Sequence, residues 1–87
     1  MHEHGLIRDL LRKLDAIVAR EGARRVRVVR VRLGALSHLS PEHFLEHFER
    51  ETAGTCAEGA KAEVELATDP AAPDALGVVL VSVDVEG

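Results

Sequence analysis

Apolar residues recur along the chain with helical and strand periods, and these periods predict two helices and three strands. Residues 6–21 carry aliphatic side chains at helical spacing, with charged side chains on the opposite face. Residues 41–52 have similar spacing, and they follow Ser40, a good N-cap, and Pro41, which suits the first helical position. The predicted buried stripe of this second helix is Phe44, Leu45 and Phe48.

Alternating apolar side chains predict strands over residues 24–33, 61–67 and 78–86. In residues 24–33 the alternation of valines slips, and a β-bulge near Val28 would restore it. The predicted inward residues of the two later strands are Ala62, Val64 and Leu66, and then Val79, Val81, Val83 and Val85.

The order helix, strand, helix, strand, strand predicts an α+β fold with two layers, in which two helices cover a three-stranded mixed sheet. Residues 78–86 form the most apolar strand, so we expect them in the middle, antiparallel to both other strands. The second helix would then be a right-handed crossover between parallel outer strands. Residues 68–77 are rich in turn formers and predict a short linker inside one domain, 1–87.

Composition and charge argue against a nucleic-acid-binding or membrane-spanning protein. The chain of 87 residues has a formal net charge of -4 and lacks Trp and Tyr, which gives no support for nucleic-acid binding. Its apolar runs are too short to span a membrane, and its start lacks the apolar stretch of a signal peptide, so we expect a cytoplasmic protein. Five arginines in residues 24–33 predict a solvated face and edge protection, with docking of an acidic partner as the alternative.

The opening Met1-His2-Glu3-His4 carries the strongest chemical signal. A free α-amine, a following backbone amide and the His2 imidazole can close fused chelate rings around one metal, a planar nitrogen site that suits Ni(II) or Cu(II). His2 is too large for the usual removal of Met1, so we expect the chain to start as written. Glu3 and His4 could supply a further amide or side-chain ligand. His38, in the predicted loop before the second helix, could be an extra ligand or an incidental loop histidine.

Other candidate chemistry is weaker. His43-Phe44-Leu45-Glu46-His47 matches the H-x-x-E-H pattern of inverted zinc peptidases, but the sequence offers no evident third ligand or substrate cleft. Cys56 is the only cysteine, so an intrachain disulfide and a Cys-based zinc ribbon are excluded, and we expect it to act as a small buried hydrophobe. A binding protein is therefore predicted, and not an enzyme.

Further short motifs follow the opening residues. They are Gly22-Ala23-Arg24-Arg25-Val26, Val31-Arg32-Leu33-Gly34-Ala35-Leu36-Ser37, Pro41-Glu42, Phe48-Glu49, and Gly54-Thr55-Cys56-Ala57-Glu58-Gly59-Ala60. Together with Met1-His2-Glu3 they resemble the HypA family of nickel-insertion proteins that mature hydrogenases. The resemblance implies a metallochaperone in which the N-terminal amine, His2 and backbone amides hold Ni(II), and Glu3 conditions the site. It also implies delivery to a hydrogenase large subunit or another nickel enzyme, alongside an accessory GTPase.

The chain departs from the family pattern between its last two strands. Family members carry a zinc domain with two CxxC pairs there, whereas this chain has only residues 68–77, so we expect no structural zinc and a near-direct hairpin connection. Where some members place an acidic residue near the second helix, this chain has Ser40, with Glu42 and His38 as neighbours. Two other functions stay open: an assembly or interaction domain without metal delivery, and a small metal-dependent hydrolase built on His43 and His47.

Overall fold

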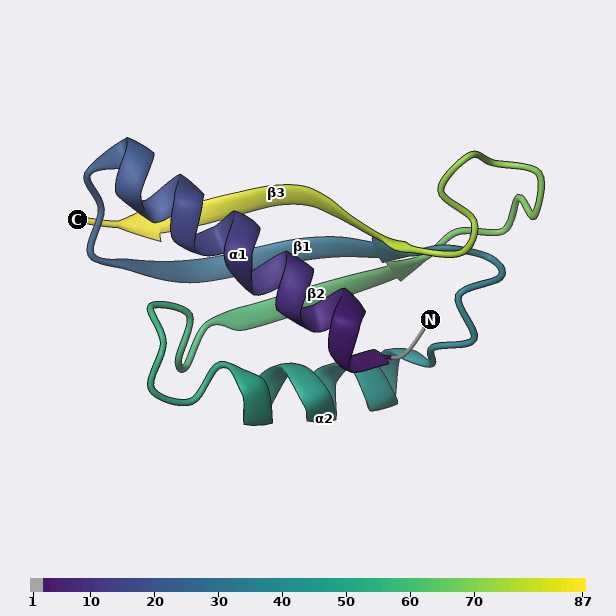
Figure 1. Cartoon of the computed structure of the whole chain (residues 1–87), viewed down its shortest axis with the longest axis horizontal. Helices are drawn as coiled ribbons and strands as arrows, with labels where there is room; N and C mark the ends of the chain where they lie inside the picture. The colour runs from purple at the N-terminus through teal and green to yellow at the C-terminus, as the bar shows by residue number, and fades with distance from the viewer. Residues whose placement is uncertain (1–2) are drawn as a thin grey trace.

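Two helices and a three-stranded mixed sheet make up the fold (Figure 1). The computed structural model describes residues 3–87, and their side chains from Gly5 onward. The elements in chain order are α1 (Glu3–Glu21), β1 (Arg25–Leu33), α2 (Pro41–Glu51), β2 (Lys61–Leu66) and β3 (Val78–Glu86). This confirms the predicted α+β class and element order. No helix within the described part of the chain is long and apolar enough to cross a bilayer.

The core lies between one face of the sheet and both helices. From α1 it takes Ile7, Leu10 and Leu14, from β1 Val26, Val29, Val31 and Leu33, and from α2 Phe44 and Phe48. The rings of Phe44 and Phe48 stack with their centroids 5.8 Å apart. Because the core has only these two aromatic rings, aliphatic side chains supply most of the buried apolar area that stabilises the fold.

The central strand is β1, so the prediction that residues 78–86 lie in the middle is wrong. The strand order is β2-β1-β3, with β1 parallel to β2 and antiparallel to β3. The parallel relation of β1 and β2, joined through α2, is as predicted. The core-facing residues of β1 are at most 1% exposed, whereas every residue of β3 keeps some exposure, so burial on the helix side selects β1 for the centre.

Arginines on the open face of β1 reach carboxylates on both neighbouring strands, so their predicted role in edge protection is also wrong. Arg30 Nε lies 2.9 Å from Glu63 Oε1 on β2, and Arg30 Nη2 lies 3.5 Å from Asp84 Oδ2 on β3. These partners, Asp84 first, raise the pKa of Arg30 above its ordinary value. The other pairs across the sheet are Arg32 with Glu65 and Arg25 with Glu86.

Two bulges set which side chains face the helices. The register of β1 with β3 shifts between Val26 and Val28, as predicted, and this brings Val26 onto the buried face. A second shift leaves Val81 as the extra residue of β3, because Arg30 pairs with Ser82 while Val31 pairs with Leu80. The residues of β3 packed against the core are Val78, Leu80 and Val83.

Two residues of β3 predicted to face inward are therefore placed differently. Val81 is 48% exposed, and Val79 pairs with Arg32 on the open face, because the bulge reverses the alternation of β3. Leu66 pairs with the buried Leu33 and so lies on the predicted face of β2, but at the end of the strand it is 56% exposed.

The connector, residues 67–77, is docked against the loop that follows β1, and it is not a hairpin because β2 and β3 do not pair. Leu36 N donates to Ala75 O at 2.7 Å, and Gly34 N donates to Gly77 O at 2.8 Å. A Cβ at Gly34 would lie 2.2 Å from Ala75 O, so only glycine fits there. The connector thereby fixes the loop that leads into α2.

Cys56 joins α1 to the turn after α2. Its Sγ donates to Asp15 Oδ1 at 3.1 Å, and the residue is half-buried, so the prediction of a plain buried hydrophobe is only partly right. Burial first, and then the hydrogen bond to Asp15, raise the pKa of the Cys56 thiol from 9.0 to about 11. The thiol is therefore protonated at neutral pH and a poor nucleophile.

We expect Ser40→Ala to lower the free energy of unfolding by about 1 kcal/mol, because Ser40 Oγ accepts the otherwise unsatisfied His43 N–H at 3.1 Å. Urea denaturation measures this change. Ser40→Asp, which keeps a side-chain acceptor, should stay near the wild-type value, and equal losses in both variants would contradict a capping role.

We expect Cys56 to react with iodoacetamide at pH 8 more slowly in the folded chain than in urea. The folded thiol titrates near 11 and the unfolded thiol near 9.0, so folding stability should fall as pH rises between these values. Alkylation kinetics and pH-dependent denaturation measure the two effects. Asp15→Asn should speed alkylation, and Cys56→Ala should lose this part of the alkaline destabilisation. An unchanged slope in Cys56→Ala would show that other groups cause it.

Candidate metal-binding site

The start of α1 carries the backbone that the predicted nickel chelate would use. Met1 and His2 lie outside the described residues, as do the side chains of Glu3 and His4. The backbone of Glu3 and His4 is helical, so α1 begins inside the opening tetrapeptide and not at Leu6 as predicted. The first N–H groups of a helix have no acceptor within it, so the Glu3 amide makes no hydrogen bond within α1 that metal binding would break.

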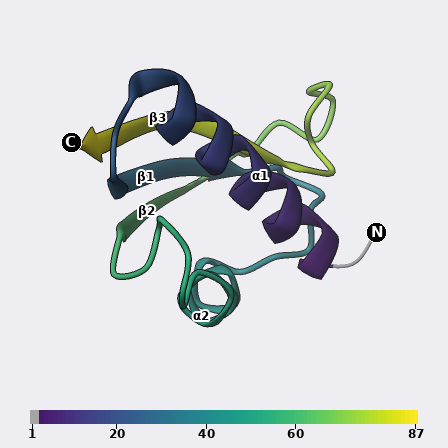
Figure 2. The same cartoon turned by 60° about the vertical axis from the view of Figure 1, so that its left-hand side comes forward.

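The loop formed by residues 34–40 lies beside the first turn of α1 in both views of the molecule (Figures 1 and 2). It enters α2, which contacts α1. Both predicted parts of the site, the amino-terminal backbone and the loop with His38, therefore lie at the same end of the fold.

His38 is the one residue other than glycine with a positive φ in the described part of the chain. Its φ is 61°, in the left-handed region that L-residues seldom adopt, although histidine is enriched there. The residues after it hold this conformation, because Leu39 is buried at 6% exposure and Ser40 caps α2. The His38 side chain itself is exposed. His38 thus has a fixed backbone of unfavourable φ and an exposed imidazole, and these features keep it as a candidate ligand.

His43 and His47 lie one turn apart on α2, as the H-x-x-E-H pattern requires. Their ring centroids are 6.2 Å apart in an edge-to-face arrangement, with His43 exposed and His47 half-buried. Among the side chains of residues 5–87, however, no group of three or more His, Cys, Asp or Glu could hold a metal ion. The described residues thus provide no third ligand for the hydrolase alternative, and they leave the amino terminus as the stronger candidate.

The contact between Gly34 and the connector holds the loop that carries His38, and the sequence did not predict it. Gly34 lies in the motif Val31-Arg32-Leu33-Gly34-Ala35-Leu36-Ser37, but its close approach to Ala75 depends on a connector conformation that no local pattern predicts. A glycine directly after a strand, four residues before the candidate ligand His38, was the available signal.

Known proteins resemble this chain in sequence and in structure. The family described as "Hydrogenase/urease nickel incorporation, metallochaperone, hypA" matches residues 1–72. Hydrogenase maturation factor HypA of Methylocella silvestris is 38% identical over 66 residues, which are 76% of this chain and 58% of that protein. The protein of the same name from Roseiflexus sp. is 38% identical over 65 residues, 75% of this chain and 53% of that protein.

The fold matches the solution structure of the Ni metallochaperone HypA from Helicobacter pylori with a TM-score of 0.80 and 16% identity, covering 99% of this chain and 98% of that one. By contrast, the chain spans about half the length of the curated relatives it matches. With 38% identity over three quarters of its length and a family match over residues 1–72, the chain belongs to the HypA family of hydrogenase/urease nickel-incorporation metallochaperones.

Proposed function

We propose that this chain binds Ni(II) at its amino terminus and delivers it to a nickel enzyme. The proposal rests on the sequence Met1-His2-Glu3 in a member of a nickel-incorporation family, together with the start of α1 at Glu3. The ligands would be the α-amine of Met1, the His2 imidazole and backbone amides that include Glu3. His4 and His38 are the extra ligands we propose.

The chemistry of these donors favours Ni(II). An amine, an imidazole and two ionised amides form a planar nitrogen set, which suits Ni(II) and Cu(II) more than Zn(II). Two ionised amides also balance the charge of the dication. The positive end of the α1 dipole stabilises an anion in the first helical turn, so it favours an ionised Glu3 amide.

Metal binding at such a site must release protons, and this fixes the sign of its pH dependence. The amine and the imidazole bind metal only in their neutral forms, with ordinary pKa values of about 7.7 and 6.5. The amides must ionise as well. Affinity for Ni(II) should therefore fall as pH drops through this range.

We further propose that residues 1–87 act as one nickel-binding domain without structural zinc, in which the docked connector replaces a zinc domain. Hydrogen bonds from Gly34 and Leu36 to the connector support this, because they close the end of the sheet without any metal. A hydrogenase large subunit or another nickel enzyme would receive the metal in the cytoplasm, alongside an accessory GTPase.

Calorimetry with Ni(II) on an untagged chain tests the amino-terminal site. We expect one tight site, and we expect His2→Ala to weaken it by more than ~100-fold, because losing a direct ligand should exceed the 10–100-fold cost of losing a ligand's supporting partner. A Gly-Ser extension before Met1 should abolish it, because the extension moves the amine away from His2.

The double variant His43→Ala/His47→Ala is the matched control and should bind Ni(II) like the wild type. Binding that survives the extension but vanishes in this double variant would move the site to α2. A wild-type chain that binds no Ni(II) would favour the assembly domain without metal delivery.

His38→Ala tests the extra ligand. We expect about a tenfold loss of Ni(II) affinity and a changed d–d absorption spectrum, because a ligand beyond the planar set alters the metal field without holding the metal alone. His38→Gly also removes the imidazole, and glycine readily adopts the positive φ of this position. It should therefore show the same loss of Ni(II) affinity and the same spectral change as His38→Ala. Wild-type spectra in both variants would make His38 an incidental loop residue.

A further inference from the structure

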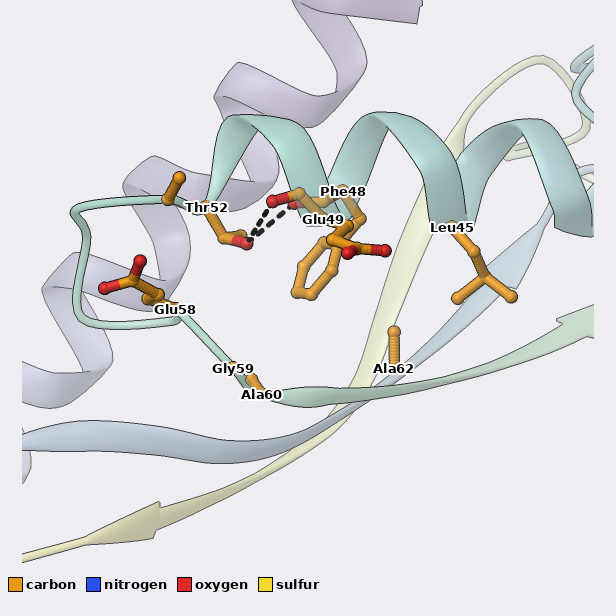
Figure 3. A pocket seen from close by; sticks show the side chains of 9 residues that line it. Leu45, Phe48, Glu49, Thr52, Glu58, Gly59, Ala60 and Ala62 are labelled. Atoms are coloured by element: carbon orange, nitrogen blue, oxygen red, sulfur yellow. Dashed lines mark hydrogen bonds between the residues drawn. The ribbon is translucent and has the colours of Figure 1, made fainter.

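A groove of about 630 Å³ lies between α2 and β2 (Figure 3). The apolar side chains of Leu45 and Phe48 point into it from the helix, and Thr52 closes its end with hydroxyl bonds to the Phe48 and Glu49 carbonyls at 2.7 and 3.3 Å. Its lining comprises Leu45, Phe48, Glu49, Thr52, Ala53, Glu58, Gly59, Ala60 and Ala62.

Two alanines, one in β2 and one directly before it, leave this groove open. Ala60 and Ala62 stand opposite α2 and are too short to cover its apolar face (Figure 3). Leu45 is consequently 40% exposed, although its place in the helical pattern predicts burial, whereas Phe48 beneath it is 3% exposed. The sheet therefore leaves part of the apolar stripe of α2 uncovered.

The groove lies along the edge of the sheet. In the part of the chain that the structure describes, β2 pairs only with β1, so along its outer edge its backbone N–H and C=O groups have no neighbouring strand. Such an edge can accept an added strand from another chain, with the side chains of alternate residues entering pockets on one face.

Carboxylates surround this edge. Glu49 and Glu58 line the groove, while Glu63 and Glu65 project from the opposite face of β2. Arg30 and Arg32 of β1 pair with Glu63 and Glu65 from one side only. The side chains of these two glutamates remain 42% and 62% exposed. The basic residue of β2 itself is Lys61 at its start, with Nζ 3.5 Å from Glu63 Oε2.

We propose that the β2 edge and its groove bind an extended segment of a partner protein in which basic and apolar residues alternate. The segment adds to the sheet as a fourth strand beside β2. Its apolar side chains enter the groove against Leu45 and Phe48, and its basic side chains stand opposite Glu63 and Glu65. The pattern is the one that β1 presents on the other side of β2, where Arg30 and Arg32 pair with the same two carboxylates.

This surface goes beyond the proposed metal site and uses none of its residues. Binding of the segment is therefore independent of Ni(II), and the failure of either proposal leaves the other standing. The competing explanation is that the charges of β2 only protect an edge strand from aggregation, in which case no segment binds.

A fluorescein-labelled peptide, Ser-Lys-Val-Arg-Leu-Lys-Thr-Gly, tests the proposal in fluorescence anisotropy titrations without metal. The expected result is saturable binding that weakens with added salt and shifts the backbone amide signals of residues 45–53 and 58–66 in ¹⁵N NMR spectra. The charge-reversed peptide Ser-Glu-Val-Asp-Leu-Glu-Thr-Gly should bind at least tenfold more weakly.

Matched variants locate the site. Leu45→Lys should weaken peptide binding at least tenfold, whereas Leu76→Lys, which changes a 69% exposed leucine in the connector, should leave it unchanged. Glu58→Lys should weaken peptide binding several-fold, whereas the control Glu21→Lys should leave it unchanged. Both glutamates are exposed, so neither substitution disturbs the core. Equal binding by Leu45→Lys and the wild type, amide shifts on another face, or self-association of the chain through β2 without peptide would each overturn the proposal.

Discussion

Burial of the aliphatic face of β1 beneath the two helices is the interaction on which the rest of the structure depends. One face of β1 is aliphatic and almost fully buried, while the other carries Arg30 between Glu63 on β2 and Asp84 on β3. The strand order thus follows from burial of the aliphatic face, and the exposed ion pairs of the other face add little to it.

The local elements were predictable from the sequence because each depends on a short pattern. Helical spacing and the Ser40 cap predict α2, and the slipped valines of β1 predict the bulge before Val28. The strand order was missed because the count of apolar residues favours β3, whereas the deciding burial of β1 depends on how α1 and α2 pack on the sheet, which no local pattern predicts. No comparable signal marks the second bulge at Val81.

The candidate site was predictable only in its chemistry. The opening residues indicate a nickel chelate, but nothing local says that α1 begins as early as Glu3 or that the loop of His38 lies beside it. That placement depends on the connector, whose carbonyls accept from Gly34 and Leu36 and so fix the loop. In this chain a short connector therefore closes the end of the sheet where the candidate site lies, and within the described residues the outer edge of β2 has no neighbouring strand.

The most direct test of the account is a ¹⁵N NMR spectrum of the untagged chain loaded with Ni(II). The account predicts loss of the Glu3 amide signal through ionisation, with every other change confined to the start of α1 and residues 34–40. These changes are shifts if the planar nitrogen set alone holds diamagnetic Ni(II), and local broadening if His38 adds an axial ligand that makes the metal paramagnetic. Broadening centred on His43 and His47, with the Glu3 amide signal unchanged, would contradict it.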